Sequence, residues 1–168
     1  MAAKESFDIT TGCDLQEVDN AVNQAVKELG QRFDFKKVNY TLEFRRGEER
    51  VVLTAEDEYK LDAIWDVLQT KLMRRGVPIK NMERSEAQKA GGMTLRQEIT
   101  LQQGIPTDTA KKIVKFLKDK KLKKIQSQIQ KDQVRITSPS RDALQQVISI
   151  LKAEDFEVEL EFGNFRSN

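Results

Sequence analysis

The stretch VNYTLEFRRGEERVVLTA, residues 38–55, decides the fold of this chain. From Val38 to Phe44, apolar side chains occupy every second position, which is typical of a strand with one buried face. The polar run around Gly47 supplies a turn, and residues 51–55 return as the partner strand. The pattern therefore predicts an antiparallel hairpin that packs one face against a core.

Helical patterns flank this hairpin on both sides. Before it, Asp14 and Glu17 have the spacing of a capping box, and we expect the helix that begins there to end at Gly30. After it, a second helix is expected from about Glu56 to Gly76. Two short strands complete this half of the chain, SFDIT at 6–10 and VPIKNME at 77–83.

The second half of the chain repeats the same order of elements. Its expected elements are a strand at 93–103, a helix around 110–117, a hairpin that turns at Lys131-Asp132, a helix capped by Ser138 or Ser140, and a closing strand FEVELEF at 156–162. The polar and glycine-containing residues 85–92 are expected to form a loop or linker. Each half then has the βαββαβ order of a ferredoxin-like domain, so the predicted fold class is α+β with two such domains in tandem.

Composition narrows the range of functions. The chain of 168 residues has no histidine and a single cysteine, Cys13, which removes the usual nucleophile triads and zinc ligand sets. We therefore expect a protein that is not an enzyme and needs no cofactor or metal. No apolar run approaches the ~18 residues of a membrane span. A lone cysteine agrees with a reducing compartment, so the expected location is cytoplasmic, with no membrane partner.

Positive charge is concentrated in one segment, although the net charge of the chain is only +2. Residues 111–126 carry eight lysines against one acid, Asp119. Such a cluster can neutralise phosphate groups, and Lys111, Lys112 and Lys115 are the candidate contacts. A solvated helix face explains the same pattern, because lysine commonly fills the exposed side of an amphipathic helix.

Two further candidate contacts lie near the C-terminus. Arg141 precedes the last helix, where free backbone N–H groups favour an anion and a guanidinium can add a bidentate contact. The alternative is that Asp142 complements the helix dipole while Arg141 is solvated. Phe165 and Arg166 form a ring and guanidinium pair that can stack on a base, or Phe165 can pin the tail against the sheet.

The segment RFDFKKV, residues 32–38, also sets rings between charges. Phe33 and Phe35 are two residues apart, so in an extended segment they point the same way. We expect both rings to fill the gap between the helix end and the sheet. The alternative is a ring at a seam between domains, in contact with a nucleotide.

Several short stretches resemble signatures of the YajQ family of small bacterial proteins. They are SFDI (6–9), RFDF (32–35), QGI (103–105), KKIVKFLKD (111–119), QIQKDQVRITS (128–138), SRDALQ (140–145) and FGNFR (162–166). The resemblance implies tandem ferredoxin-like domains that exchange their first strands. On that basis residues 11–102 form the N-terminal unit, with the strand 93–102 inserted, and residues 103–168 with the strand 5–10 form the C-terminal unit.

The resemblance also implies nucleotide binding, with RNA, including tRNA, or a cyclic dinucleotide as the ligand. The favoured hypothesis is thus a non-enzymatic protein that binds nucleotide phosphates through its basic helix. The alternative is an adaptor with a protein partner, or a ligand-responsive regulator of a transcription factor. An enzyme that uses carboxylates or lysine is a third hypothesis.

Overall fold

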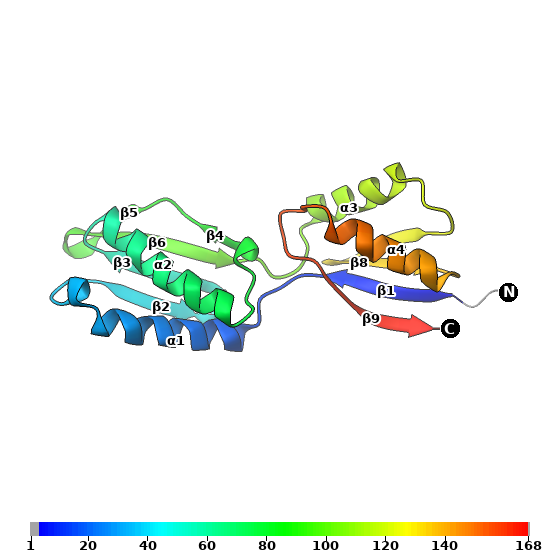
Figure 1. The fold of residues 1–168 in the computed structure, drawn as a ribbon. Coiled ribbons are helices and arrows are strands. Elements are labelled where there is room, and N and C mark those ends of the chain that lie inside the picture. The colour runs from blue at the N-terminus through cyan, green and yellow to red at the C-terminus, as the bar shows by residue number, and fades with distance from the viewer. Residues whose placement is uncertain (1–3, 168) are drawn as a thin grey trace. The chain divides into compact units, whose positions relative to one another are not determined.

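The computed structural model of the protein describes residues 4–167, and these divide into two compact units. We call residues 13–102 the central unit, and residues 4–12 with 103–167 the terminal unit. Each unit contains one sheet and two helices (Figure 1). Both units therefore have the predicted α+β, ferredoxin-like arrangement of one sheet and two helices.

The sheet of the terminal unit contains strands from both ends of the chain. Its strands are β1 (Glu5–Thr10), β7 (Gln126–Gln130), β8 (Gln133–Ser138) and β9 (Glu161–Ser167), in the order β7-β8-β1-β9. β1 is antiparallel to both of its neighbours, β8 and β9. In Figure 1 the blue strand near the N-terminus lies beside the red strand near the C-terminus.

The sheet of the central unit has the order β2-β3-β6-β4, and β5 also pairs with β6. Its strands are β2 (Thr41–Arg45), β3 (Arg50–Ala55), β4 (Met82–Arg84), β5 (Gln88–Ala90) and β6 (Thr94–Leu101). The first strand of the second sequence repeat, β6, thus pairs with strands of the first repeat, and β1 pairs with strands of the second.

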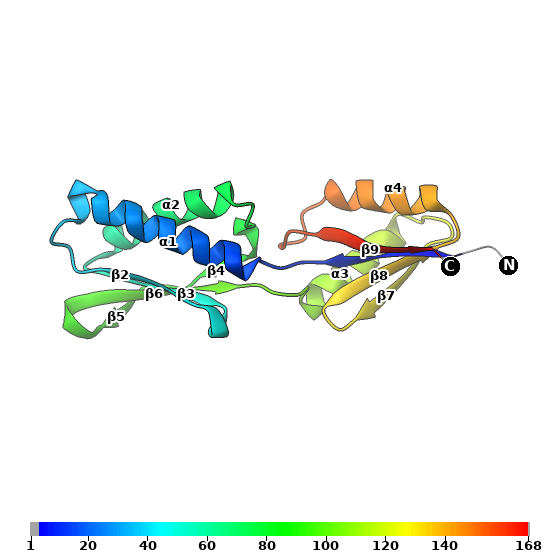
Figure 2. The same ribbon diagram turned by 90° about the horizontal axis from the view of Figure 1, so that it is seen from below.

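Two helices pack on each sheet. They are α1 (Leu15–Gln31) and α2 (Glu58–Arg74) in the central unit, and α3 (Thr107–Asp119) and α4 (Arg141–Lys152) in the terminal unit. In Figure 2, α1 and α2 lie together on one side of the central unit's sheet. Single 3-10 turns lie at Phe33–Phe35, Arg46–Glu48, Ile79–Asn81 and Gly91–Met93.

The core of the terminal unit follows from strand alternation. Phe7 of β1 stands opposite Ile136 of β8, and Ile9 stands opposite Val134. All four side chains are fully buried in one cluster with apolar residues of α3 and α4. Because successive strand residues point to opposite faces, Asp8 lies on the face away from the helices.

Asp8 is nevertheless only 3% exposed, because three polar side chains surround its carboxylate. Arg135 of β8 places its Nε 2.9 Å from Oδ1, Arg166 of β9 lies 3.7 Å from Oδ2, and the Asn164 amide donates a hydrogen bond. The hydrogen bond from Arg135 is the main cause that lowers the pKa of Asp8. One carboxylate of β1 thereby contacts both neighbouring strands.

The expected end of the first helix at Gly30 is wrong. α1 continues to Gln31, and Gly30 is an ordinary helical residue: beyond its own helix backbone and chain neighbours, no described atom lies within 4 Å of where a Cβ would be. A glycine near the end of a helical pattern therefore did not act as a left-handed cap here.

The expectation that both rings of RFDF are buried is half wrong. Phe35 is 4% exposed and packs edge-to-face on Tyr40, with ring centroids 5.1 Å apart, whereas Phe33 is 85% exposed. The segment forms a 3-10 turn instead of a strand. Since a 3-10 helix turns ~120° per residue, residues two apart point in different directions.

Three other expected boundaries also differ from the structure. Residues 85–92 are not a simple linker, because β5 within them pairs with β6. The strand expected at 77–83 is shorter and shifted. A 3-10 turn occupies 79–81, and the strand β4 covers only 82–84. The last strand begins at Glu161, because Glu157 has a left-handed φ of 73°. Phe156 and Val158 are still buried, so their alternation reflects a packed loop.

Two glycines should respond oppositely to substitution by alanine. Gly30→Ala removes backbone freedom within a helix and meets no atom, so it should stabilise the protein by ~0.5–1 kcal/mol. Gly104 has a φ of 84°, and its added Cβ would lie 2.7 Å from Cβ of Asp132, so Gly104→Ala should destabilise by ~1 kcal/mol or more. Urea unfolding followed by circular dichroism measures both. Destabilisation by Gly30→Ala would contradict the helical assignment.

Asp8→Asn should lower the free energy of unfolding at pH 7 by ~1–3 kcal/mol, because it removes charge-assisted hydrogen bonds at a buried position. A lowered folded-state pKa means that this contribution is complete above the ordinary carboxyl pKa of ~3.9 and is lost as pH falls through the folded value. The difference between wild type and variant should therefore shrink below about pH 4. Asp34→Asn, which breaks an exposed pair with Arg32, is the control and should change little. Equal effects of the two substitutions would contradict the role of Asp8.

Candidate functional site

The lysines of α3 form two groups. Lys111, Lys115 and Lys118 recur at i, i+4 and i+7, so they form one exposed stripe along the helix. Within residues 4–167, none of these three makes an ion pair or a hydrogen bond through its side chain. They are therefore free to meet an anion.

Lys112 leaves α3 on another side, because the helix turns ~100° per residue. Its Nζ lies 2.9 Å from Oε1 of Glu157, and this hydrogen bond raises the pKa of Lys112. On the same flank, Phe116 packs edge-to-face on Phe156 with ring centroids 5.4 Å apart. The structure thus separates Lys112 from the predicted contacts Lys111 and Lys115.

A pocket of about 630 Å³ lies beside the lysine stripe, between α3 and the edge strand β7. Its lining combines an apolar surface with side-chain amides, hydroxyls and one lysine. These residues are Val114, Leu117, Lys118, Leu122, Ile125, Gln126, Ser127, Gln128 and Thr137.

A second pocket of about 330 Å³ continues the first along β7. The two pockets share Ile125, Gln126 and Thr137, and the second adds Lys4 and Lys124. We call the two pockets together the α3–β7 groove. It has a lysine, Lys118, in one part and two lysines in the other, and it belongs entirely to the terminal unit.

The α3–β7 groove has the parts that a nucleotide needs. Ligand pockets in proteins are mostly apolar, with a few polar groups that fix orientation. An apolar floor can accept a planar base, the amides of Gln126 and Gln128 can donate to and accept from its edge, and lysine can neutralise phosphate. The lysine run indicated this region in the sequence, whereas the groove itself was not predicted.

The other three predicted contacts come together at a different pocket. Arg141 of α4 and Phe165 and Arg166 of β9 line a cavity of about 340 Å³, which we call the α4–β9 pocket. Phe165 is 60% exposed and its ring centroid lies 5.8 Å from that of Phe7. The remaining lining residues are Glu5, Ser6, Leu144, Gln145 and Ser167.

Both guanidinium groups of the α4–β9 pocket already have carboxylate partners. Arg141 donates two hydrogen bonds to Glu5, at 3.0 and 3.3 Å, and Arg166 lies 3.7 Å from Asp8. The hydrogen bond from Arg141 lowers the pKa of Glu5, so this carboxylate stays ionised at neutral pH. An anionic ligand would have to compete with it, which makes this pocket a weaker phosphate site than the groove.

The described part of the chain shows no group of three His, Cys, Asp or Glu side chains that could hold a metal ion. Among residues 4–167, no helix is both long and apolar enough to cross a bilayer. Two acidic residues near helix ends have local roles: Asp57 caps α2, and Asp155 accepts a hydrogen bond from the backbone N–H of Glu157.

Comparison with known proteins places the chain in one family. A family model described as "Nucleotide-binding protein YajQ-like" matches residues 5–166. A nucleotide-binding protein of Koribacter versatilis is 46% identical over 166 residues, which cover 99% of each chain. One from Trichlorobacter lovleyi is 47% identical over 161 residues, covering 96% of this chain and 98% of the relative. One from Bacillus cereus is 46% identical over 166 residues, covering 99% of this chain and 100% of the relative. The chain therefore belongs to the family of YajQ-like nucleotide-binding proteins.

Proposed function

We propose that the protein binds a nucleotide ligand in the α3–β7 groove and does not transform it. The single observation that carries the proposal is the composition of this groove, which joins an apolar floor, amide side chains and lysines with no ion-pair partner within residues 4–167. The names of its relatives as nucleotide-binding proteins support the ligand class.

The groove suggests how each part of the ligand is held. A base would lie on the apolar surface of Val114, Leu122 and Ile125, and Gln126 and Gln128 would hydrogen-bond its edge. The phosphates would face Lys118 at one part of the groove and Lys124 at the other. Lys111 and Lys115 extend the positive stripe and would raise the local concentration of an anion.

The placement of the lysines favours a ligand with more than one phosphate position. Lys118 lines the larger pocket, while Lys4 and Lys124 line the smaller one. A mononucleotide presents its phosphate at one end only, whereas a cyclic dinucleotide or single-stranded RNA has phosphates along its length. We therefore propose one of these two ligands.

A protein partner is the second candidate, and the edge of the sheet favours it. β7 is an edge strand whose five residues carry no charge, and charged residues are a common protection of such edges. The other edge strand, β9, has a register irregularity and carries Arg166. An extended acidic segment could add to β7 as a further strand beside the lysines.

Removal of two groove lysines should weaken ligand binding. Lys118→Gln/Lys124→Gln should lower the affinity for cyclic di-GMP and for a short single-stranded RNA about tenfold or more, since a lost charged contact of ~1.4 kcal/mol is a factor of ten. Lys37→Gln/Lys89→Gln removes the same charge from the central unit and should cost less than about threefold. Fluorescence anisotropy at two salt concentrations measures both.

Several outcomes would contradict the proposal. Equal losses in the two double variants would show a diffuse charge effect instead of a site. Loss of binding only in Arg141→Gln/Phe165→Ala would place the ligand in the α4–β9 pocket. Recovery of a hydrolysed nucleotide after incubation with the pure protein would contradict binding without turnover. Binding of an acidic peptide that excludes both nucleotide ligands would favour the protein partner.

A nucleotide with a single phosphate should bind more weakly than the two proposed ligands. GMP can reach only one of the two lysine positions at a time, so we expect its affinity to be at least about tenfold below that of cyclic di-GMP. Calorimetric titration of the two ligands into the same protein sample measures this ratio. Equal affinities would show that only one part of the groove is used.

A further inference from the structure

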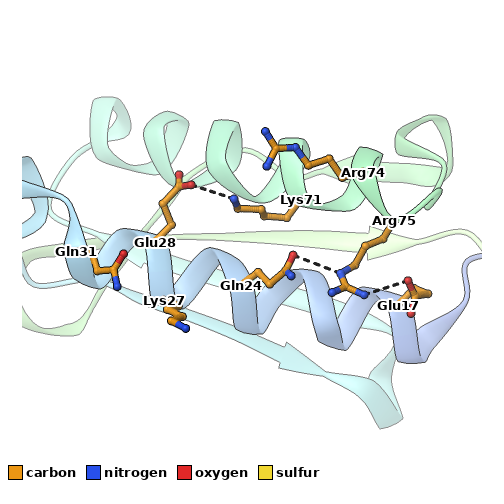
Figure 3. Close-up of a pocket in the computed structure, with 8 residues that line it drawn as sticks. All are labelled: Glu17, Gln24, Lys27, Glu28, Gln31, Lys71, Arg74 and Arg75. Atoms are coloured by element: carbon orange, nitrogen blue, oxygen red, sulfur yellow. Dashed lines mark hydrogen bonds and ion pairs between the residues drawn. The ribbon is translucent and has the colours of Figure 1, made fainter.

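The central unit has a large groove of its own, between α1 and α2 (Figure 3). Its volume is about 730 Å³. α1 contributes one helix face, and α2 contributes its last turn and the residue that follows. The lining residues are Glu17, Gln24, Lys27, Glu28 and Gln31 from α1, and Lys71, Arg74 and Arg75 from the end of α2. We call this cavity the α1–α2 groove.

Every side chain that lines the α1–α2 groove is polar or charged. Four are cationic and two are carboxylates, so the groove carries an excess of two positive charges. The lining contains no aromatic or aliphatic residue on which a base could stack, unlike that of the α3–β7 groove. A ligand of the α1–α2 groove would thus be recognised by its charge.

Two of the four cations bridge the helices. Lys71 is 14% exposed, and its Nζ lies 3.0 Å from Oε1 of Glu28. Arg75 lies 3.3 Å from Glu17 and donates a further hydrogen bond of 3.3 Å to Gln24. These contacts join α1 to α2 and leave no carboxylate of the groove for the other two cations.

The remaining cations, Lys27 and Arg74, make no ion pair or hydrogen bond through their side chains within the described range 4–167. Figure 3 shows them on the two flanks of the groove, Lys27 on α1 and Arg74 on α2. A cation at the C-terminal end of α2 complements the helix dipole, which accounts for Arg74 but not for Lys27.

We propose that the α1–α2 groove binds a compact polyanion, specifically a chain of two or three linked phosphates. A single phosphate is small relative to a cavity of 730 Å³ and would not reach both flanks. A longer phosphate backbone that ran along the groove would face the carboxylates of Glu17 and Glu28. A short phosphate chain that crosses the groove meets Lys27 and Arg74 and can accept hydrogen bonds from Arg75 and the amide of Gln24.

The phosphate chain could belong to a nucleoside triphosphate or be free polyphosphate, since the lining has no aromatic or aliphatic residue to hold a base. Inorganic tripolyphosphate, ATP and GTP should therefore bind the Lys118→Gln/Lys124→Gln variant, which lacks two lysines of the α3–β7 groove, with affinities within about threefold of one another, and orthophosphate at least tenfold more weakly. A preference of more than tenfold for ATP or GTP over tripolyphosphate would overturn this part of the proposal.

Two double variants test the site by isothermal titration of tripolyphosphate. Lys27→Gln/Arg74→Gln should weaken binding at least about tenfold, and Lys37→Gln/Lys89→Gln, which removes the same charge elsewhere in the central unit, less than about twofold. Within residues 4–167 neither Lys27 nor Arg74 has an ion-pair partner, so the melting temperature without ligand should change little, by no more than the small contribution of Arg74 to the α2 dipole. Tripolyphosphate should raise the melting temperature of the wild type and of the control, and not that of the groove variant.

Three results would overturn the proposal. They are no binding of tripolyphosphate at millimolar concentration, equal losses in both variants, or loss only in Lys118→Gln/Lys124→Gln, which would place the anion in the α3–β7 groove. The proposal does not rest on nucleotide binding at that groove. If one of the two grooves proves not to bind its ligand, binding at the other groove can still be tested with its own pair of variants.

Discussion

The position of β1 is the constraint on which the terminal unit depends. This strand lies between β8 and β9, and the carboxylate of Asp8 contacts Arg135 on one side and Asn164 and Arg166 on the other. Phe7 and Ile9 of the same strand fill the core beneath α3 and α4. Because β8 pairs with β1, and β7 pairs only with β8, β7 is left as an edge strand. The edge beside α3 is where the proposed nucleotide groove lies.

The two grooves of the protein differ in the chemistry that they offer. The α3–β7 groove has apolar residues such as Leu122 and Ile125 beside amides and lysines, so it can recognise a base as well as a phosphate. The α1–α2 groove has charged and amide side chains only, so it would recognise a ligand chiefly by its charge. Each groove lies within one unit, and each unit therefore carries a candidate anion site of its own.

Periodicity was enough to predict the hairpins and the four helices, because those patterns arise from one buried face. It failed where the backbone departs from regular geometry. Phe33 and Phe35 alternate as in a strand but belong to a 3-10 turn, and the alternation of 156–160 belongs to a loop. The lysine run identified the region of the candidate site. The sequence pattern did not show that Val114 and Ile125 line a groove, because apolar residues at such positions are typical of a core. The pairing of Arg141 with Glu5, 136 residues away, has no local signal in the sequence.

The central claim is that the nucleotide ligand lies in the α3–β7 groove, and backbone amide chemical shifts test it most directly. Cyclic di-GMP is added stepwise to isotope-labelled protein, and the residues whose amide signals move are mapped on the structure. We predict that the largest changes fall in 114–118 and 124–128, with small changes elsewhere. Largest changes at 5–6, 141–145 and 165–167 would place the ligand in the α4–β9 pocket and contradict the account.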